Sequence, residues 1–125
     1  MARILVVEDT PAVRETLELM IADAGHETEV AENGRVALRR LREDVYDLVI
    51  TDVIMPDLDG NEVILETRKL PTVPKIIAIS GGGLRVDKDE ALMLARSQAD
   101  ATLKKPFTHQ ELQTAVNGVL TASAA

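Results

Sequence analysis

Five polar residues stand at the ends of short apolar runs, and their chemistry suits binding a metal ion: Glu8, Asp9, Asp52, Ser80 and Lys105. Two like charges ~4 Å apart repel by about 4 kcal/mol at a surface-like dielectric, so clustered carboxylates need positive charge beside them. Lys105 supplies one unit, and a divalent cation is the natural complement. The chain has no cysteine, and neither histidine belongs to this pattern. Ligation by oxygen alone favours a hard ion such as magnesium.

These residues can meet only if the runs that precede them are neighbouring strands. Strand-like runs occupy residues 4–7, 28–31, 47–51, 75–79 and 101–104. Helical spacing of apolar residues predicts helices over about 10–24, 34–43, 61–69 and 87–98, and a last helix that contains 112–120. Strands that alternate with helices predict a parallel sheet with helices on both faces. Ligands bind beyond the carboxyl ends of the strands in such sheets, which is where the five polar residues would lie.

Each of these residues also has a structural explanation when it is taken alone. Glu8 and Asp9 could serve only to begin the following helix, and Asp52 is a common type of turn residue. Ser80 precedes three glycines and would fit any permissive loop. The structural explanation fails for the whole set, because five polar groups from distant parts of the chain would gather at one edge of the sheet.

Short-range signals mark the ends of the first helix. Thr10 is expected as its N-cap, Pro11 as its first helical residue and Gly25 as its stop. The two histidines lie away from the strand ends: His26 precedes the second strand, and His109 falls in the first turn of the last helix. Both are expected to be surface residues.

The composition describes an acidic chain of single-domain size. Its 125 residues carry a net charge of -7 without a long basic run, so no direct nucleic-acid partner is expected. The absence of cysteine weakly favours a reducing compartment. No signal-peptide pattern is present, and no apolar run approaches the ~18 residues of a membrane helix. We therefore expect a cytoplasmic protein without a membrane partner, with one domain over residues 1–125 whose last residues, 121–125, form a frayed tail.

Four segments together resemble the receiver domain of bacterial response regulators, and the resemblance extends over essentially the whole chain. They read RILVVED at 3–9, YDLVITDVIMPDLDG at 46–60, KIIAIS at 75–80 and KPF at 105–107. The resemblance implies a flavodoxin-like α/β fold: one doubly wound, five-stranded parallel sheet of order 2-1-3-4-5, flanked by five helices. It also implies a role as a phosphoacceptor switch in two-component signalling rather than as an enzyme.

The resemblance assigns a role to each site residue. Asp52 would accept a phosphoryl group from the phosphohistidine of a sensor histidine kinase or a phosphotransfer protein. Asp9 and Asp52 would bind Mg²⁺ directly, Glu8 would help through water, and the main-chain carbonyl of Ile54 would complete the protein ligands. An ionised carboxylate needs no general base for this attack. Phosphoryl transfer otherwise needs positioning and charge cancellation, which such a site supplies.

The remaining roles concern the phosphoryl oxygens and the output surface. The resemblance implies that Lys105 contacts the phosphoryl oxygens and that Ser80 bonds the attached group. Neighbours along a strand point to opposite faces, so Lys104 is expected to face solvent. A downstream protein target would bind the fourth helix, fifth strand and fifth helix. The sequence departs from the family at Thr102, where an aromatic switch residue is common, and at the apolar Ile54, where polar side chains are common.

Other functions remain open at this stage. A Mg²⁺-dependent phosphohydrolase acting on a free substrate would share the carboxylates and the lysine, although it would need a DxD pair after the first strand, where Glu8-Asp9 stands. A flavin-binding module is a second alternative, but the chain has no suitable phosphate loop after the first strand and only two aromatic residues that could stack on a flavin. A receiver that is not phosphorylated is disfavoured, because all the acidic residues are present. The chain could be a stand-alone regulator or a module of a larger protein.

Overall fold

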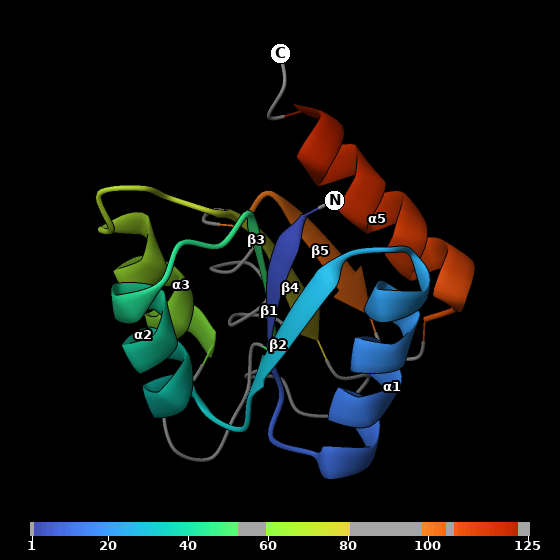
Figure 1. The fold of residues 1–125 in the computed structure, drawn as a ribbon, viewed down its shortest axis with the longest axis horizontal. Coiled ribbons are helices and arrows are strands. Elements are labelled where there is room, and N and C mark those ends of the chain that lie inside the picture. Colours follow the sequence, from blue (N-terminus) through green and yellow to red (C-terminus); the bar gives the residue numbers. More distant parts are fainter. Residues whose placement is uncertain (1, 53–59, 81–98, 105–106, 123–125) are drawn as a thin grey trace.

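A computed structural model describes residues 2–52, 60–80, 99–104 and 107–122 of the chain. Strands and helices alternate as far as the fourth strand, and the fifth strand and the last helix complete the described elements (Figure 1). The strands are β1 (Arg3–Val7), β2 (Glu27–Ala31), β3 (Leu48–Asp52), β4 (Lys75–Ser80) and β5 (Ala101–Lys104). The helices are α1 (Pro11–Asp23), α2 (Gly34–Glu43), α3 (Gly60–Arg68) and α5 (His109–Ala122). The helix expected at 87–98 lies outside the described residues.

The strands form one parallel sheet in the order β2-β1-β3-β4-β5, as the resemblance implied. Its register pairs Ile4 with Leu48 and Val7 with Thr51 across β1 and β3. Helices α1 and α5 cover one face of the sheet, and α2 and α3 cover the other (Figure 1). β1, β3 and β4 each have a partner on both sides, so they form the centre of the sheet.

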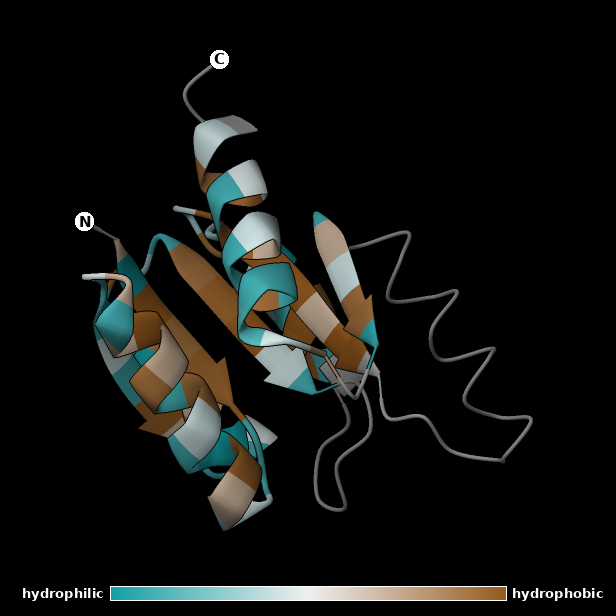
Figure 2. Cartoon of the chain, turned by 90° about the vertical axis from the view of Figure 1, so that its right-hand side faces the viewer, coloured by the Kyte–Doolittle hydropathy of each residue, from teal (hydrophilic) through white to brown (hydrophobic). Residues whose placement is uncertain are grey.

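The core divides into two layers, because successive strand residues point to opposite faces. Ile4 and Val6 pack with the α1 and α5 side, whereas Leu5 and Val7 pack with the α2 side, and these four side chains are at most 1% exposed. The central strands β1, β3 and β4 are accordingly hydrophobic over most of their length (Figure 2). Burial on both faces explains why the central strands read as continuous apolar runs. None of the described helices combines the length and hydrophobicity that crossing a membrane requires.

Several strand and helix boundaries differ by one residue from those expected, and one expected capping contact is not made. β3 runs over 48–52 rather than 47–51, and β4 extends to Ser80, so Asp52 and Ser80 are the last residues of their strands. Thr10 occupies the N-cap position of α1, but its side chain makes no capping hydrogen bond. Pro11 is the first helical residue as expected. Gly25 follows the helix end with a φ of 89°, a conformation that glycine adopts without strain.

The two histidines differ from each other. His109 is exposed, as expected. His26 is half-buried rather than a surface residue, and its Nδ1 accepts a hydrogen bond from the main-chain N–H of Ala2 at 3.0 Å. His26 therefore helps to tie the amino end of β1 to the start of β2, a role that its place in a turn did not reveal.

An ion-pair network lies under α2, away from the polar edge described below. Arg3 contacts Glu29 at 2.6 Å, and Arg40 of α2 contacts the other oxygen of the same carboxylate at 3.3 Å. The Arg3 guanidinium also lies 4.9 Å from the ring centroid of Tyr46. The Tyr46 hydroxyl is buried, and no acceptor among the described residues lies in hydrogen-bonding geometry with it. Burial raises the pKa of Tyr46, and the negative charge of Glu29 raises it further.

Replacing Tyr46 by Phe should make the chain more resistant to alkaline unfolding. Because the folded state raises the pKa of the phenol, its contribution to stability is complete below the unfolded value of about 10 and falls as the pH rises through the folded value. The free energy of unfolding of wild type should therefore fall more steeply above pH ~10 than that of Tyr46→Phe.

The measurement is denaturant unfolding at a series of alkaline pH values. Tyr46 is the only tyrosine and no tryptophan is present, so phenolate absorbance reports this one group. At neutral pH Tyr46→Phe should be at least as stable as wild type, because its buried hydroxyl has no acceptor in hydrogen-bonding geometry among the described residues. Parallel stability curves above pH ~10, or a phenol that ionises at its ordinary pKa, would contradict the burial argument.

Candidate functional site

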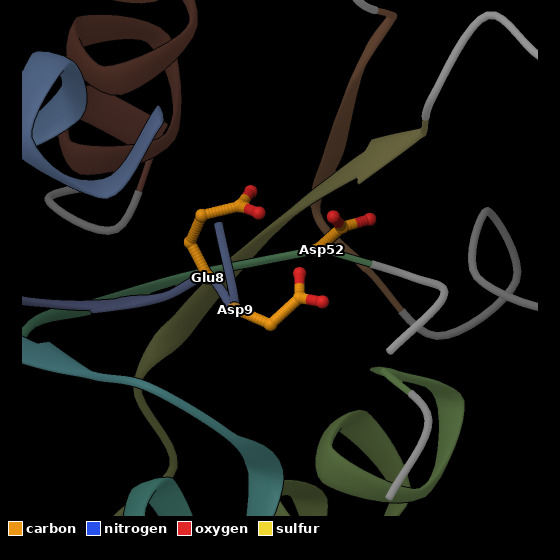
Figure 3. A group of neighbouring side chains, drawn as sticks. All are labelled: Glu8, Asp9 and Asp52. Carbon is orange, nitrogen blue, oxygen red and sulfur yellow. The ribbon is translucent and has the colours of Figure 1, made fainter. Parts of the chain in front are cut away.

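Three carboxylates converge at the carboxyl ends of β1 and β3. Glu8 and Asp9 follow β1, and Asp52 is the last residue of β3. One carboxylate oxygen of each lies within 4.8 Å of the others. In Figure 3 the side chains come from two neighbouring strand ends, and their oxygens face a common space. This arrangement brings together residues that are more than forty positions apart in sequence.

The register of the sheet produces this convergence. β1 and β3 are parallel neighbours, and Val7 is paired with Thr51. The residues that follow each member of this pair are therefore side by side, which places Glu8 and Asp9 next to Asp52. The apolar side chains that precede them fix the register, because a shift of one residue would turn every side chain to the opposite face.

Glu8 is a fully buried carboxylic residue held from several directions. It is 0% exposed, whereas Asp52 is 7% exposed and Asp9 is half-buried. Its main-chain N–H donates to the carbonyl oxygen of Ala31 at 3.1 Å. Its carboxylate accepts from the main-chain N–H of Thr10 at 3.2 Å. Asp9 is thus the most accessible of the three carboxylates, and Glu8 forms the closed side of the site.

The structure adds Arg14, which the sequence analysis did not identify. Its Nη1 donates a hydrogen bond to the main-chain carbonyl oxygen of Glu8 at 3.0 Å. The signal that could have found it is its spacing from Pro11: side chains in a helix lean toward the N-terminus, so residue 14 reaches back over the residues before the helix. Glu8 thus accepts two hydrogen bonds from this region, one from the main chain of Thr10, just before α1, and one from the side chain of Arg14 in α1.

The three carboxylates fit a hard divalent cation. With oxygens within 4.8 Å of one another, each pair of ionised carboxylates repels by roughly 3–4 kcal/mol at a surface-like dielectric. Among the described residues, these three are the acidic group whose oxygens are close enough to hold one ion. The donors are carboxylate oxygens alone, which suits Mg²⁺ with several waters retained. Bringing the carboxylates together without a cation is unfavourable, so their convergence favours metal binding.

The remaining residues expected in the site are described only in part. Ser80 is the last residue of β4, next to β3, where Asp52 pairs with Ile79. Lys105 and Ile54 lie outside the described residues. Lys104, the last residue of β5, is exposed as expected, and Thr102 on the same strand is half-buried.

Comparison with known proteins supports the same interpretation. A family model described as the response regulator receiver domain matches residues 4–117. A Haemophilus influenzae protein named transcriptional regulatory protein CpxR homolog is 36% identical over 124 residues, or 99% of this chain and 52% of that protein. The chain therefore spans about half the length of this relative.

Two solved structures resemble the fold closely. The response regulator TrrA of Thermotoga maritima, solved in complex with Mg²⁺-BeF, is 37% identical with a TM-score of 0.80, covering 95% of this chain and 99% of that one. The receiver domain of the Pseudomonas aeruginosa sensor histidine kinase PA1611, solved with magnesium in its active site cleft, is 28% identical with a TM-score of 0.85, covering 96% and 98%. The matched family model, the strand order and the three converging carboxylates agree, and the chain belongs to the receiver domain family of two-component response regulators.

Proposed function

We propose that this chain is a phosphorylation-controlled switch whose phosphoacceptor is Asp52. The observation that carries the proposal is the convergence of Glu8, Asp9 and Asp52 within 4.8 Å at the carboxyl edge of the sheet. An oxygen of the Asp52 carboxylate attacks the phosphorus of a phosphohistidine on a sensor histidine kinase or phosphotransfer protein. The phosphorus–nitrogen bond breaks and its electron pair returns to the ring, which is protonated on its other nitrogen and leaves as neutral imidazole. An aspartyl phosphate remains. Asp52 is buried, at 7% exposure, and sits beside the more accessible, half-buried Asp9.

The residues of the chain have distinct tasks in this step. Asp9 and Asp52 would hold Mg²⁺ directly, with Glu8 acting through water and the Ile54 carbonyl as a further ligand. When bound, Mg²⁺ cancels charge on the transferring oxygens. Two solved receivers of the same fold contain magnesium, which supports this choice of ion. Phosphorylation is then a switch rather than turnover of a free substrate, because the product stays on the protein.

Two further residues would read the phosphoryl group. Lys105 would contact its oxygens and Ser80 would bond it, and the position of Ser80 at the end of the strand beside β3 supports the second role. The added charge of roughly -1.5 to -2 biases an equilibrium between conformations that already exist. With Thr102 in place of an aromatic switch residue, the hydroxyl of Ser80 would carry more of this response.

We also propose the setting in which the switch works. Residues 1–125 form a single receiver domain in the cytoplasm; residues 121 and 122, expected in a frayed tail, belong to α5, and 123–125 lie outside the described residues. Its downstream partner is a protein that binds β5, α5 and the expected fourth helix, and the net charge of -7 argues against direct nucleic-acid binding. The exposure of Lys104 on the edge strand β5 is consistent with an accessible output surface.

Replacing Asp9 by Asn should stabilise the metal-free protein and weaken its response to Mg²⁺. One of three repelling charges is removed, so the melting temperature without metal should rise by a few degrees. Wild type should gain about 2.7 kcal/mol at a Mg²⁺ concentration of one hundred times the dissociation constant, and Asp9→Asn much less. Thermal unfolding with chelator and with Mg²⁺ measures both effects.

The matched control is Glu27→Gln, which removes one exposed acidic charge at the opposite end of the sheet. It should leave the Mg²⁺-dependent gain intact. A wild-type protein whose unfolding ignores Mg²⁺ at millimolar concentration would count against the metal site.

Incubation with Mg²⁺ and acetyl phosphate should add one phosphoryl group to the wild-type chain. Intact mass spectrometry detects the addition, and it should be absent in Asp52→Ala and when Mg²⁺ is chelated. The reason is that Asp52 is the nucleophile and the other two carboxylates only hold the cation. Addition to the Asp52→Ala protein would assign the reaction to another residue, and steady hydrolysis of a phosphate ester over many turnovers would favour a phosphohydrolase instead.

Replacing Ile54 by Asn should shorten the lifetime of the aspartyl phosphate several-fold. On this hypothesis an apolar side chain two residues after Asp52 would keep water from the phosphoryl group, whereas an amide would bind and orient water there. Loss of the phosphorylated mass over time, after removal of acetyl phosphate, measures this rate. Ile54→Val, which keeps the position apolar, is the control and should decay like wild type; an unchanged rate in Ile54→Asn would refute the water-access hypothesis.

A further inference from the structure

Arg14 links the first turns of α1 to the acidic cluster through the main chain. Its Nη1 lies 3.0 Å from the carbonyl oxygen of Glu8, and its side chain is half-buried. That carbonyl belongs to the peptide unit between Glu8 and Asp9, the two neighbouring residues that supply carboxylates to the site. We propose that Arg14 is a positioning residue for the metal centre, which orients this peptide so that both carboxylates face Asp52. The inference rests on the proposed Mg²⁺-dependent function.

The peptide needs such a tie because it lies between two regular elements. β1 ends at Val7 and α1 begins at Pro11, so Glu8 and Asp9 lie between two regular elements, and the Glu8 N–H donates to the carbonyl oxygen of Ala31. The Thr10 N–H fixes the Glu8 carboxylate. Arg14 fixes the carbonyl on the remaining side, and a hydrogen bond from a charged donor is stronger than one between neutral groups. Glu8 is therefore restrained at its amide, its side chain and its carbonyl.

Positioning and charge compensation predict opposite effects on metal affinity. If Arg14 served only to offset the carboxylate charges, its removal would strengthen Mg²⁺ binding, because a competing positive charge would be gone. If it orients the Glu8–Asp9 peptide, its removal should weaken Mg²⁺ binding. The bond to a main-chain carbonyl rather than to a carboxylate favours orientation. Groups that orient metal ligands typically account for 10- to 100-fold in affinity.

The test compares Mg²⁺ dissociation constants, measured by calorimetry, for wild type, Arg14→Met, Arg14→Lys and Arg39→Met. Arg14→Met should bind Mg²⁺ about tenfold more weakly. Arg14→Lys, which keeps a charged donor, should recover most of the affinity. Arg39 is exposed on α2, on the other face of the sheet. The Arg39→Met substitution removes the same charge there and should leave the Mg²⁺ affinity as in wild type.

A second measurement uses the metal-free proteins. Hydrogen exchange by NMR should show faster exchange of the Glu8 and Thr10 amides in Arg14→Met than in wild type or Arg39→Met. The Glu8 amide donates to Ala31 and the Thr10 amide donates to the Glu8 carboxylate, so both bonds depend on the position of Glu8. Arg14→Gln takes the place of Arg14→Met if thermal unfolding shows that the methionine variant does not fold. Equal or tighter Mg²⁺ binding together with unchanged exchange would overturn the positioning role. A wild-type protein that binds no Mg²⁺ and accepts no phosphoryl group would contradict the proposed function instead.

Discussion

The parallel pairing of β1 with β3 is the interaction on which the candidate site depends. It places Val7 opposite Thr51, and from that one pair the positions of Glu8, Asp9 and Asp52 follow. The three carboxylates repel one another, so their own interactions do not favour this arrangement. They are brought together by the apolar residues that precede them, which are buried on both faces of the sheet.

Aliphatic burial is large enough to impose that cost. A fully buried Val, Leu or Ile side chain contributes about 1.5–3 kcal/mol, and each pair of carboxylates opposes folding by roughly 3–4 kcal/mol at these separations. The central strands hold many such side chains, among them Ile4, Val6 and Ile50, each 0% exposed. The core can therefore hold an electrostatically unfavourable cluster in place. This is why a strand as apolar as β3 can end in a carboxylate without losing its position in the sheet.

The periodic features of the chain were predictable from sequence, and the features that depend on single long side chains were not. Continuous apolar runs around Val6 and Ile50 predicted central strands. The polar residues at the ends of these runs predicted a site at the carboxyl edge of the sheet. The strand order came from the resemblance to receivers, since periodicity does not specify which strands are neighbours. By contrast, Arg14 reaches the Glu8 carbonyl through a flexible side chain, and His26 accepts a main-chain hydrogen bond across the start of β1. No repeating pattern encodes such contacts, because they depend on the path of a loop.

The acidic residues of the site are held in two different ways. The sheet supplies rigid positions for Asp52 and, through β1, for the peptide that carries Glu8 and Asp9. That peptide follows the last residue of β1, and its restraints include individual hydrogen bonds to Ala31, Thr10 and Arg14. Two of those partners, Thr10 and Arg14, are the capping residue and an early residue of α1. The acidic cluster is therefore held by the sheet through β1 and β3, and Glu8 is also held by hydrogen bonds from Thr10 and from Arg14 of α1.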